Sequence, residues 1–81
     1  MHAVMYSTAL CPYCFRARRL LERHEISYEE RRMRRRDRAQ LAELGGGLTY
    51  PQIVIGERVV DGFSELRRLE RDGRLMAISR R

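Results

Sequence analysis

The chain contains no lysine and no tryptophan, and only two cysteines and two prolines among its 81 residues. Two cysteines are too few for the disulfide framework of small secreted proteins. No uninterrupted apolar run exceeds four residues, which excludes a transmembrane helix. No basic segment followed by an apolar one opens the chain, so we expect no secretory leader and a cytoplasmic location. The length then predicts a single small domain over residues 1–81.

Arginine supplies all of the basic side chains, and its excess is concentrated in one segment. The 17 arginines outnumber the 11 acidic residues, and the net charge is +6. Residues 31–38 hold six arginines and one aspartate, a net charge of +5. We expect a solvated strand end and loop there, and attraction of an anionic substrate or acidic partner stays open. No aromatic platform or recognition motif accompanies the run, so we predict no specific nucleic-acid partner.

The hydrophobic pattern alternates between strand and helix segments. Strands are predicted at residues 3–7, 26–29 (running toward Met33), 52–55 and 58–60. Helices are predicted at about 12–24, at about 38–44, and from Ser64 to near Gly73. The first strand–helix–strand unit should give parallel strands and the last two strands an antiparallel hairpin. We therefore expect an α/β fold with a mixed sheet and helices on its faces.

Local residue types mark several boundaries of these elements. Pro12 fits the first position of a helix, where its missing N–H costs nothing. Asp37 is predicted to cap the second helix, with Gln40 as the reciprocal partner. The three glycines at 45–47 end that helix. A tight turn at 56–57 joins the last two strands.

Cys11 and Cys14 stand where the first strand passes into the first helix. A helix N-terminus offers unpaired N–H groups and a partial positive charge, which stabilise a sulfur at the cap as the reactive thiolate. Two intervening residues put Cys14 in the first turn, within disulfide reach of Cys11. We therefore predict that Cys11 attacks a disulfide and that Cys14, which is less exposed, resolves the mixed disulfide.

Other uses of this cysteine pair fit the sequence less well. Inert core cysteines do not account for a proline between them at a helix start. Zinc usually takes four ligands from paired motifs, and only His2 and His24 remain to supply the rest. His24 lies roughly 15 Å further along the same helix, at about 1.5 Å per residue. We therefore predict no metal site, and no permanent structural disulfide.

A second motif, Thr49-Tyr50-Pro51-Gln52, directly precedes the apolar strand at 53–55. Together with the CPYC sequence at 11–14, it resembles the glutaredoxins of the thioredoxin-fold superfamily, and the resemblance spans nearly the whole chain. TYPQIVIG at 49–56 is similar to the family's Thr-Val-Pro segment, and Asp61-Gly62 stands at its Gly-Gly pair. The resemblance implies a thioredoxin-like fold: a four-stranded mixed sheet with three helices.

The same resemblance implies an activity and its partners. The protein would be a glutathione-dependent thiol–disulfide oxidoreductase that reduces protein disulfides and protein–glutathione mixed disulfides through the Cys11 thiolate. Glutathione would be a co-substrate, and no cofactor would be tightly bound. Its partners would be glutathione and disulfide-containing or glutathionylated proteins. We expect a monomer without a membrane partner.

The resemblance further implies how glutathione is held. Pro51 would be cis and face the Cys11 sulfur, and the Tyr50 backbone would pair with the cysteinyl unit like an added strand. The N–H groups of Phe63 and Ser64 would receive the γ-glutamyl carboxylate. Arg38 would contact the glycine carboxylate. The implied glutathione-binding residues are Tyr13, Arg38, Thr49, Tyr50, Pro51, Gly62, Phe63 and Ser64.

Two positions depart from the family pattern. Thr8 stands where the family often has a lysine, and Asp61 replaces the first glycine of the Gly-Gly pair. The first change removes a cation near the thiolate and the glutathione carboxylate, and the second would weaken binding of the γ-glutamyl carboxylate if Asp61 points inward. They leave open a glutaredoxin-like electron donor, for example to ribonucleotide reductase, that thioredoxin reductase reduces. A second alternative is a non-enzymatic carrier whose two Cys11 thiolates and two glutathiones hold an iron–sulfur cluster between two chains. Pro12 disfavours that carrier.

Overall fold

The computed structural model describes residues 3–79, so His2, a candidate zinc ligand, lies outside it. The elements are β1 (Ala3–Ser7), α1 (Pro12–Arg23), β2 (Tyr28–Arg32), the 3-10 helix η1 (Arg35–Asp37), α2 (Ala39–Ala42), β3 (Gln52–Ile55), β4 (Arg58–Asp61), α3 (Gly62–Arg71) and α4 (Leu75–Ser79). None of the described helices has the length and apolar character needed to span a membrane.

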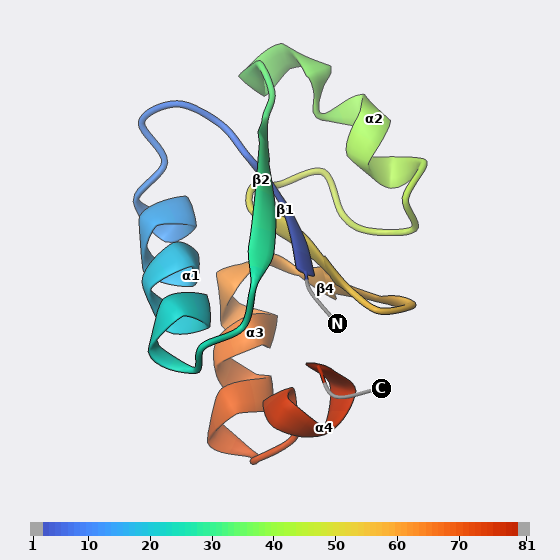
Figure 1. The fold of residues 1–81 in the computed structure, drawn as a ribbon. Helices are drawn as coiled ribbons and strands as arrows, with labels where there is room; N and C mark the ends of the chain where they lie inside the picture. The colour runs from blue at the N-terminus through green and yellow to red at the C-terminus, as the bar shows by residue number, and fades with distance from the viewer. Residues whose placement is uncertain (1–2, 80–81) are drawn as a thin grey trace.

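The described strands form one four-stranded sheet in the order β2-β1-β3-β4 (Figure 1). β1 pairs with β2 in parallel and with β3 antiparallel, and β3 pairs antiparallel with β4. Ile55 lies opposite Arg58, so residues 56–57 form the predicted two-residue turn, with Gly56 at a φ of 64°. The predicted parallel unit and the predicted hairpin are both confirmed.

The main core lies between the sheet and the helix pair α1 and α3, which lie side by side (Figure 1). Its principal members are Ala3, Met5, Ala17, Leu20, Leu21, Ile53, Ile55, Val60, Leu66 and Leu69. Leu41, the buried residue of α2, lies outside this cluster. β1 and β4 run in the same direction, so α1 and α3, which follow them, begin at the same edge of the sheet.

The helix predicted at 38–44 is shorter than expected. Asp37 lies inside η1 and does not cap α2, because Arg34 Nε donates to its carboxylate at 2.8 Å. Arg38 occupies the cap position without a side-chain hydrogen bond. Gly45, at a φ of 88°, carries the chain out of this segment, as the glycine run predicted.

Three further boundaries differ from the prediction. β2 begins at Tyr28 because Ile26 is buried in the core and its N–H donates to the Leu21 carbonyl at 3.0 Å. α3 begins at Gly62, two residues before the expected start at Ser64. The prediction of three helices missed α4, whose Leu75 is buried in the core. Five residues are too few to show helical periodicity in a sequence.

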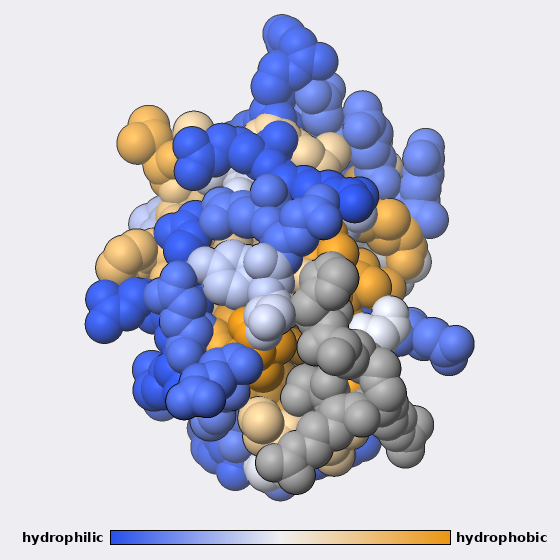
Figure 2. All heavy atoms as spheres, in the orientation of Figure 1, coloured by the Kyte–Doolittle hydropathy of each residue, from blue (hydrophilic) through white to orange (hydrophobic). Residues whose placement is uncertain are grey.

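The arginines of segment 31–38 are all exposed, which confirms the expected solvated strand end and loop. Figure 2 shows hydrophilic side chains gathered over the end of β2 and the segment that leads to α2. Arg31 and Arg34 are paired with Glu29 and Asp37. The segment thus forms a charged border above the start of β3.

Glu30 of β2 connects the sheet to α1. Arg18 donates to both of its carboxylate oxygens, at 2.8 and 2.7 Å, and Ser7 Oγ donates at 2.7 Å. The hydrogen bond from Arg18, aided by that from Ser7, holds the pKa of Glu30 below its ordinary value. This cluster fixes the orientation of α1 over the parallel strand pair.

Replacing Glu30 by Gln is expected to lower the free energy of unfolding at pH 7 by about 1–3 kcal/mol, because Arg18 loses its charged acceptor. The pKa of Glu30 is lower in the folded than in the unfolded chain. Its contribution is therefore complete above the unfolded value of about 4.3 and is lost as the pH falls through the folded value.

Urea unfolding at pH 7, 5 and 3 measures this effect. The wild type should lose stability below pH 5, and Glu30→Gln should lose less over the same interval. Glu57→Gln, in the exposed hairpin turn, is the matched control. A Glu57→Gln profile as flat as that of Glu30→Gln would contradict the assignment.

Candidate active site

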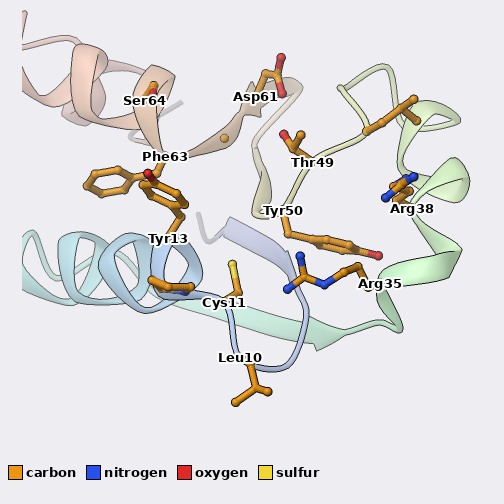
Figure 3. A pocket seen from close by; sticks show the side chains of 13 residues that line it. Leu10, Cys11, Tyr13, Arg35, Arg38, Thr49, Tyr50, Asp61, Phe63 and Ser64 are labelled. Atoms are coloured by element: carbon orange, nitrogen blue, oxygen red, sulfur yellow. The ribbon is translucent and has the colours of Figure 1, made fainter.

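The ends of β1 and β4 and the beginning of β3 meet at one edge of the sheet, as the pairing of Tyr6 with Gln52 and of Gln52 with Asp61 shows. An open cavity of about 750 Å³ lies at this edge (Figure 3). Eight predicted site residues line it: Cys11, Tyr13, Arg38, Thr49, Tyr50, Gly62, Phe63 and Ser64. The other two, Cys14 and Pro51, are buried and do not line it.

Cys11 occupies the N-cap of α1, with Pro12 as the first helical residue. Its backbone is extended, and its Sγ accepts a hydrogen bond from the Cys14 N–H at 3.2 Å. The first turn of α1 carries no acidic side chain. Figure 3 shows the sulfur pointing into the cavity. The helix N-terminus therefore favours negative charge on a sulfur that a substrate can reach.

Cys14 lies one turn further along and is only 1% exposed. Both cysteines are free thiols in this structure. Burial, followed by the hydrogen bond with Cys11, raises the pKa of Cys14 to about 12, against the lowering effect of a backbone hydrogen bond at Thr8. Cys14 therefore stays protonated at neutral pH, which leaves Cys11 as the more accessible of the two thiols.

The Tyr50–Pro51 peptide bond is cis, which confirms the expectation drawn from the resemblance. The Tyr50 side chain extends toward the arginine segment, where its Oη donates to the Arg34 carbonyl at 3.0 Å. Figure 3 shows its ring beside Arg35. Burial raises the pKa of Tyr50, so the phenol remains a donor. The family resemblance implied only a backbone role for Tyr50, and this anchor for the arginine segment was not predicted.

Gln52 holds the loop before β3 in place although it is fully buried. Its Nε2 donates to the Thr49 carbonyl at 2.9 Å and to Asp61 Oδ1 at 2.7 Å, and its Oε1 accepts from the Gly47 N–H at 3.3 Å. A Cβ on Gly47 would lie 2.6 Å from Asp61 Oδ1, so a side chain there would displace the Asp61 carboxylate that binds Gln52. Asp61 thus has a structural partner, and Figure 3 shows its carboxylate turned away from Cys11.

The N-terminus of α3 faces the same cavity. Asp61 is its N-cap residue but makes no side-chain capping hydrogen bond. The first N–H groups of this ten-residue helix, at Gly62, Phe63 and Ser64, are therefore left available to a negatively charged ligand. Gly62 has a φ of 84°, a conformation that a side chain would strain.

Aromatic, cationic and apolar side chains complete the cavity wall. The Tyr13 and Phe63 rings lie 6.2 Å apart, and Phe63 both lines the cavity and packs against the core. Arg35 and Arg38 line the wall, and neither forms an ion pair with the part of the chain described here.

Leu10, Leu48 and Arg35 line the cavity although the sequence analysis did not select them. Leu10 is 95% exposed and adopts a φ of 57°. Arg35 could have been identified from the sequence, because it belongs to the arginine run. The two leucines could not have been identified, because an exposed leucine and a core leucine look alike in a sequence.

Between residues 3 and 79, no group of three His, Cys, Asp or Glu side chains gathers as a metal site would require. His24 caps the opposite end of α1 from the cysteines, and its Nε2 lies 2.6 Å from the Glu70 carboxylate. This contact connects the end of α1 to α3.

The family model for glutaredoxin matches residues 3–60, more than half of the chain. A glutaredoxin of Pseudomonas aeruginosa is 46% identical over 77 residues, which cover 93% of this chain and 92% of that protein. Glutaredoxin 1 of Rickettsia typhi is 38% identical over 76 residues, covering 89% and 73%.

Solved structures agree with this match. The solution structure of the Brucella melitensis glutaredoxin has a TM-score of 0.78 at 34% identity, covering 96% of this chain and 87% of that one. The crystal structure of a buckwheat glutaredoxin–glutathione complex shares the fold, with a TM-score of 0.80 at 24% identity, covering 94% and 74%. With its cysteine pair at the start of α1, this chain belongs to the glutaredoxin family of thiol–disulfide oxidoreductases.

Proposed function

We propose that this protein uses glutathione to reduce protein–glutathione mixed disulfides and protein disulfides through the Cys11 thiolate. The observation that carries the proposal is the placement of Cys11 in one cavity with two separate anion sites. One is the uncapped start of α3, and the other is the pair Arg35 and Arg38. Glutathione has a carboxylate at each end and a cysteinyl unit between them, which suits this arrangement. The buckwheat relative is known as a glutathione complex.

With a mixed disulfide, the Cys11 thiolate attacks the glutathione sulfur. A Cys11–glutathione disulfide forms, the original disulfide breaks, and the substrate cysteine leaves as a thiolate that takes up a proton. A second glutathione thiolate then attacks the bound glutathione sulfur. Oxidised glutathione leaves and the Cys11 thiolate is restored. This route does not use Cys14.

With a protein disulfide, the Cys11 thiolate attacks one substrate sulfur, the substrate disulfide breaks, and the other substrate cysteine leaves as a thiolate that takes up a proton. The Cys14 thiolate then attacks the Cys11 sulfur, the mixed disulfide breaks, and the first substrate cysteine leaves as a thiolate. The charge of Cys11 and its hydrogen bond both raise the pKa of Cys14. Both effects end when the Cys11 sulfur enters a disulfide, so Cys14 ionises more readily at the step that requires it. The product is a Cys11–Cys14 disulfide, which two glutathiones reduce through a Cys11–glutathione intermediate.

The electron-donor alternative rests on Thr8 and Asp61. Thr8 has an uncharged side chain and is buried, so this position supplies no cation to the cavity. Asp61 is hydrogen-bonded to Gln52 and turned away from Cys11, so its charge weakens glutathione binding only modestly, which supports the glutathione-dependent proposal over the alternative. A cytoplasmic location and a monomeric state stay predictions.

The different environments of the two thiols predict selective alkylation. Iodoacetamide at pH 8 is expected to modify Cys11 in the reduced native protein and to modify Cys14 at least about 100-fold more slowly, because Cys14 is buried with a raised pKa. Tandem mass spectrometry localises the label. In the urea-denatured control both cysteines should react alike, and equal labelling in the native protein would contradict the assigned roles.

Variants of the two cysteines test the route on a small glutathione mixed disulfide, with glutathione and glutathione reductase as the reducing system. Cys11→Ser is expected to lower turnover at least about 100-fold, because the attacking sulfur is gone. Cys14→Ser, the matched control, should keep most of the activity. Turnover supported by thioredoxin reductase and not by glutathione would replace this proposal by the electron-donor function.

Asp61→Asn keeps an oxygen acceptor for Gln52 and removes one negative charge from the cavity wall. The KM for glutathione is expected to fall about two- to fivefold, since a nearby like charge at an exposed site costs up to about 1 kcal/mol. Steady-state kinetics measure the change. Asp72→Asn, at the far end of α3, should leave the KM unchanged, and an increase in Asp61→Asn would refute this account of Asp61.

A further inference from the structure

A second, shallower cleft of about 310 Å³ lies between α1 and α3. Its lining consists of four arginines and two phenylalanines: Phe15, Arg16, Arg19, Arg23, Phe63 and Arg67. We propose that this α1–α3 cleft is a docking site for an acidic polypeptide segment next to the reacting cysteine of a substrate protein. The inference rests on the proposed function, because it concerns the substrate of the same Cys11 sulfur.

The charges of the α1–α3 cleft are only partly balanced. Glu70 is the one acidic side chain that its arginines contact in the described part of the chain, and Arg23 donates to it at 2.8 Å. Arg67 lies 3.8 Å from the same carboxylate, which His24 also contacts. One carboxylate therefore serves two arginines and a histidine.

Arg16 and Arg19 have no carboxylate partner among the described residues. Their guanidinium groups lie over the Tyr13 and Phe15 rings, 5.6 and 5.8 Å from the ring centres. The rings hold the two guanidinium groups in place, and the guanidinium N–H groups stay available to donate. A planar guanidinium in this position binds a carboxylate through two parallel hydrogen bonds.

The α1–α3 cleft adjoins the active-site cavity. Phe63 lines both, and Tyr13, which contacts Phe63 and lies under Arg16, lines the cavity that holds Cys11. A polypeptide joined to Cys11 through its own cysteine can therefore continue over the Tyr13–Phe63 pair into the cleft. The other side of the cavity holds Arg35 and Arg38, which the proposed function assigns to glutathione.

The features of the cleft favour an acidic polypeptide over a nucleic acid. Binding of single strands relies on open aromatic faces on which successive bases stack. Here a guanidinium group lies over the rings of Tyr13 and Phe15. The reacting atom at Cys11 is also a sulfur, so the molecule that reaches it must carry a cysteine.

Three peptides that differ only in charge test the docking site. Each carries one cysteine as a mixed disulfide with glutathione, flanked on both sides by three Glu, three Gln or three Lys. The wild type is expected to reduce the Glu peptide with a kcat/KM about five- to tenfold above that of the Gln peptide, because about three exposed ion pairs each contribute a factor near two. The Lys peptide should be the slowest, and the preference should shrink as salt is raised.

The double variant Arg16→Gln/Arg19→Gln should lose most of this preference and keep wild-type turnover of a small glutathione mixed disulfide. Arg68→Gln/Arg71→Gln removes the same charge from exposed positions of α3 that do not line the cleft, and it should keep the preference. An equal loss of the preference in both double variants would show that the preference depends on net charge alone, and would overturn the docking site.

The controls separate the docking site from the activity on which it rests. If the wild type does not turn over the small mixed disulfide with glutathione, the proposed function itself fails. If it does, and the Glu, Gln and Lys peptides react alike, only the docking site fails. Binding of a single-stranded oligonucleotide that Arg16→Gln/Arg19→Gln abolishes, without any preference for the Glu peptide, would assign the cleft to nucleic acid and overturn the proposal.

Discussion

The chemistry of this protein depends on the start of α1, where the Cys14 N–H donates to the Cys11 sulfur at 3.2 Å. That contact exists only because Cys11 is the cap residue and Pro12 begins the helix. The helix in turn is held by Leu20 and Leu21 in the core and by the Arg18–Glu30 pair on the sheet. Core packing far from the sulfur therefore sets the direction of the helix N-terminus that stabilises the thiolate.

The remaining parts of the cavity come from distant segments, and the side chains of Gln52, which is buried, and Tyr50, which is partly exposed, hold them together. Gln52 joins the loop of Thr49 and Gly47 to Asp61 at the end of β4. Tyr50 joins the same loop to the segment that carries Arg35 and Arg38. In both cases a side chain fixes the position of groups to which the proposed function assigns anion binding.

Arginine serves two different purposes in this structure. Some guanidinium groups are paired with carboxylates and connect elements, as Arg18 connects α1 to Glu30 and Arg23 connects α1 to Glu70. Others have no carboxylate partner among the described residues: Arg35 lines the cavity that holds Cys11, and Arg16 lines the adjoining cleft. On the function proposed above, these unpaired cations would attract anionic substrates and help to select among them.

The sequence by itself determined the order of strands and helices, the parallel and hairpin pairings, and the cysteine pair at the start of α1. These follow from local periodicity, from Pro12 and from the spacing of Cys11 and Cys14, which are short-range features. It also placed the cap of α2 on Asp37, which is wrong because the carboxylate is bound to Arg34.

Only the tertiary structure decided which arginines are paired, that the Tyr50 side chain anchors Arg34, and that Asp61 is bound to Gln52. It also brought α1 and α3 together into a second cationic cleft and buried the short helix α4. These contacts join residues far apart in the chain, and no local pattern specifies which partner a long polar side chain will reach.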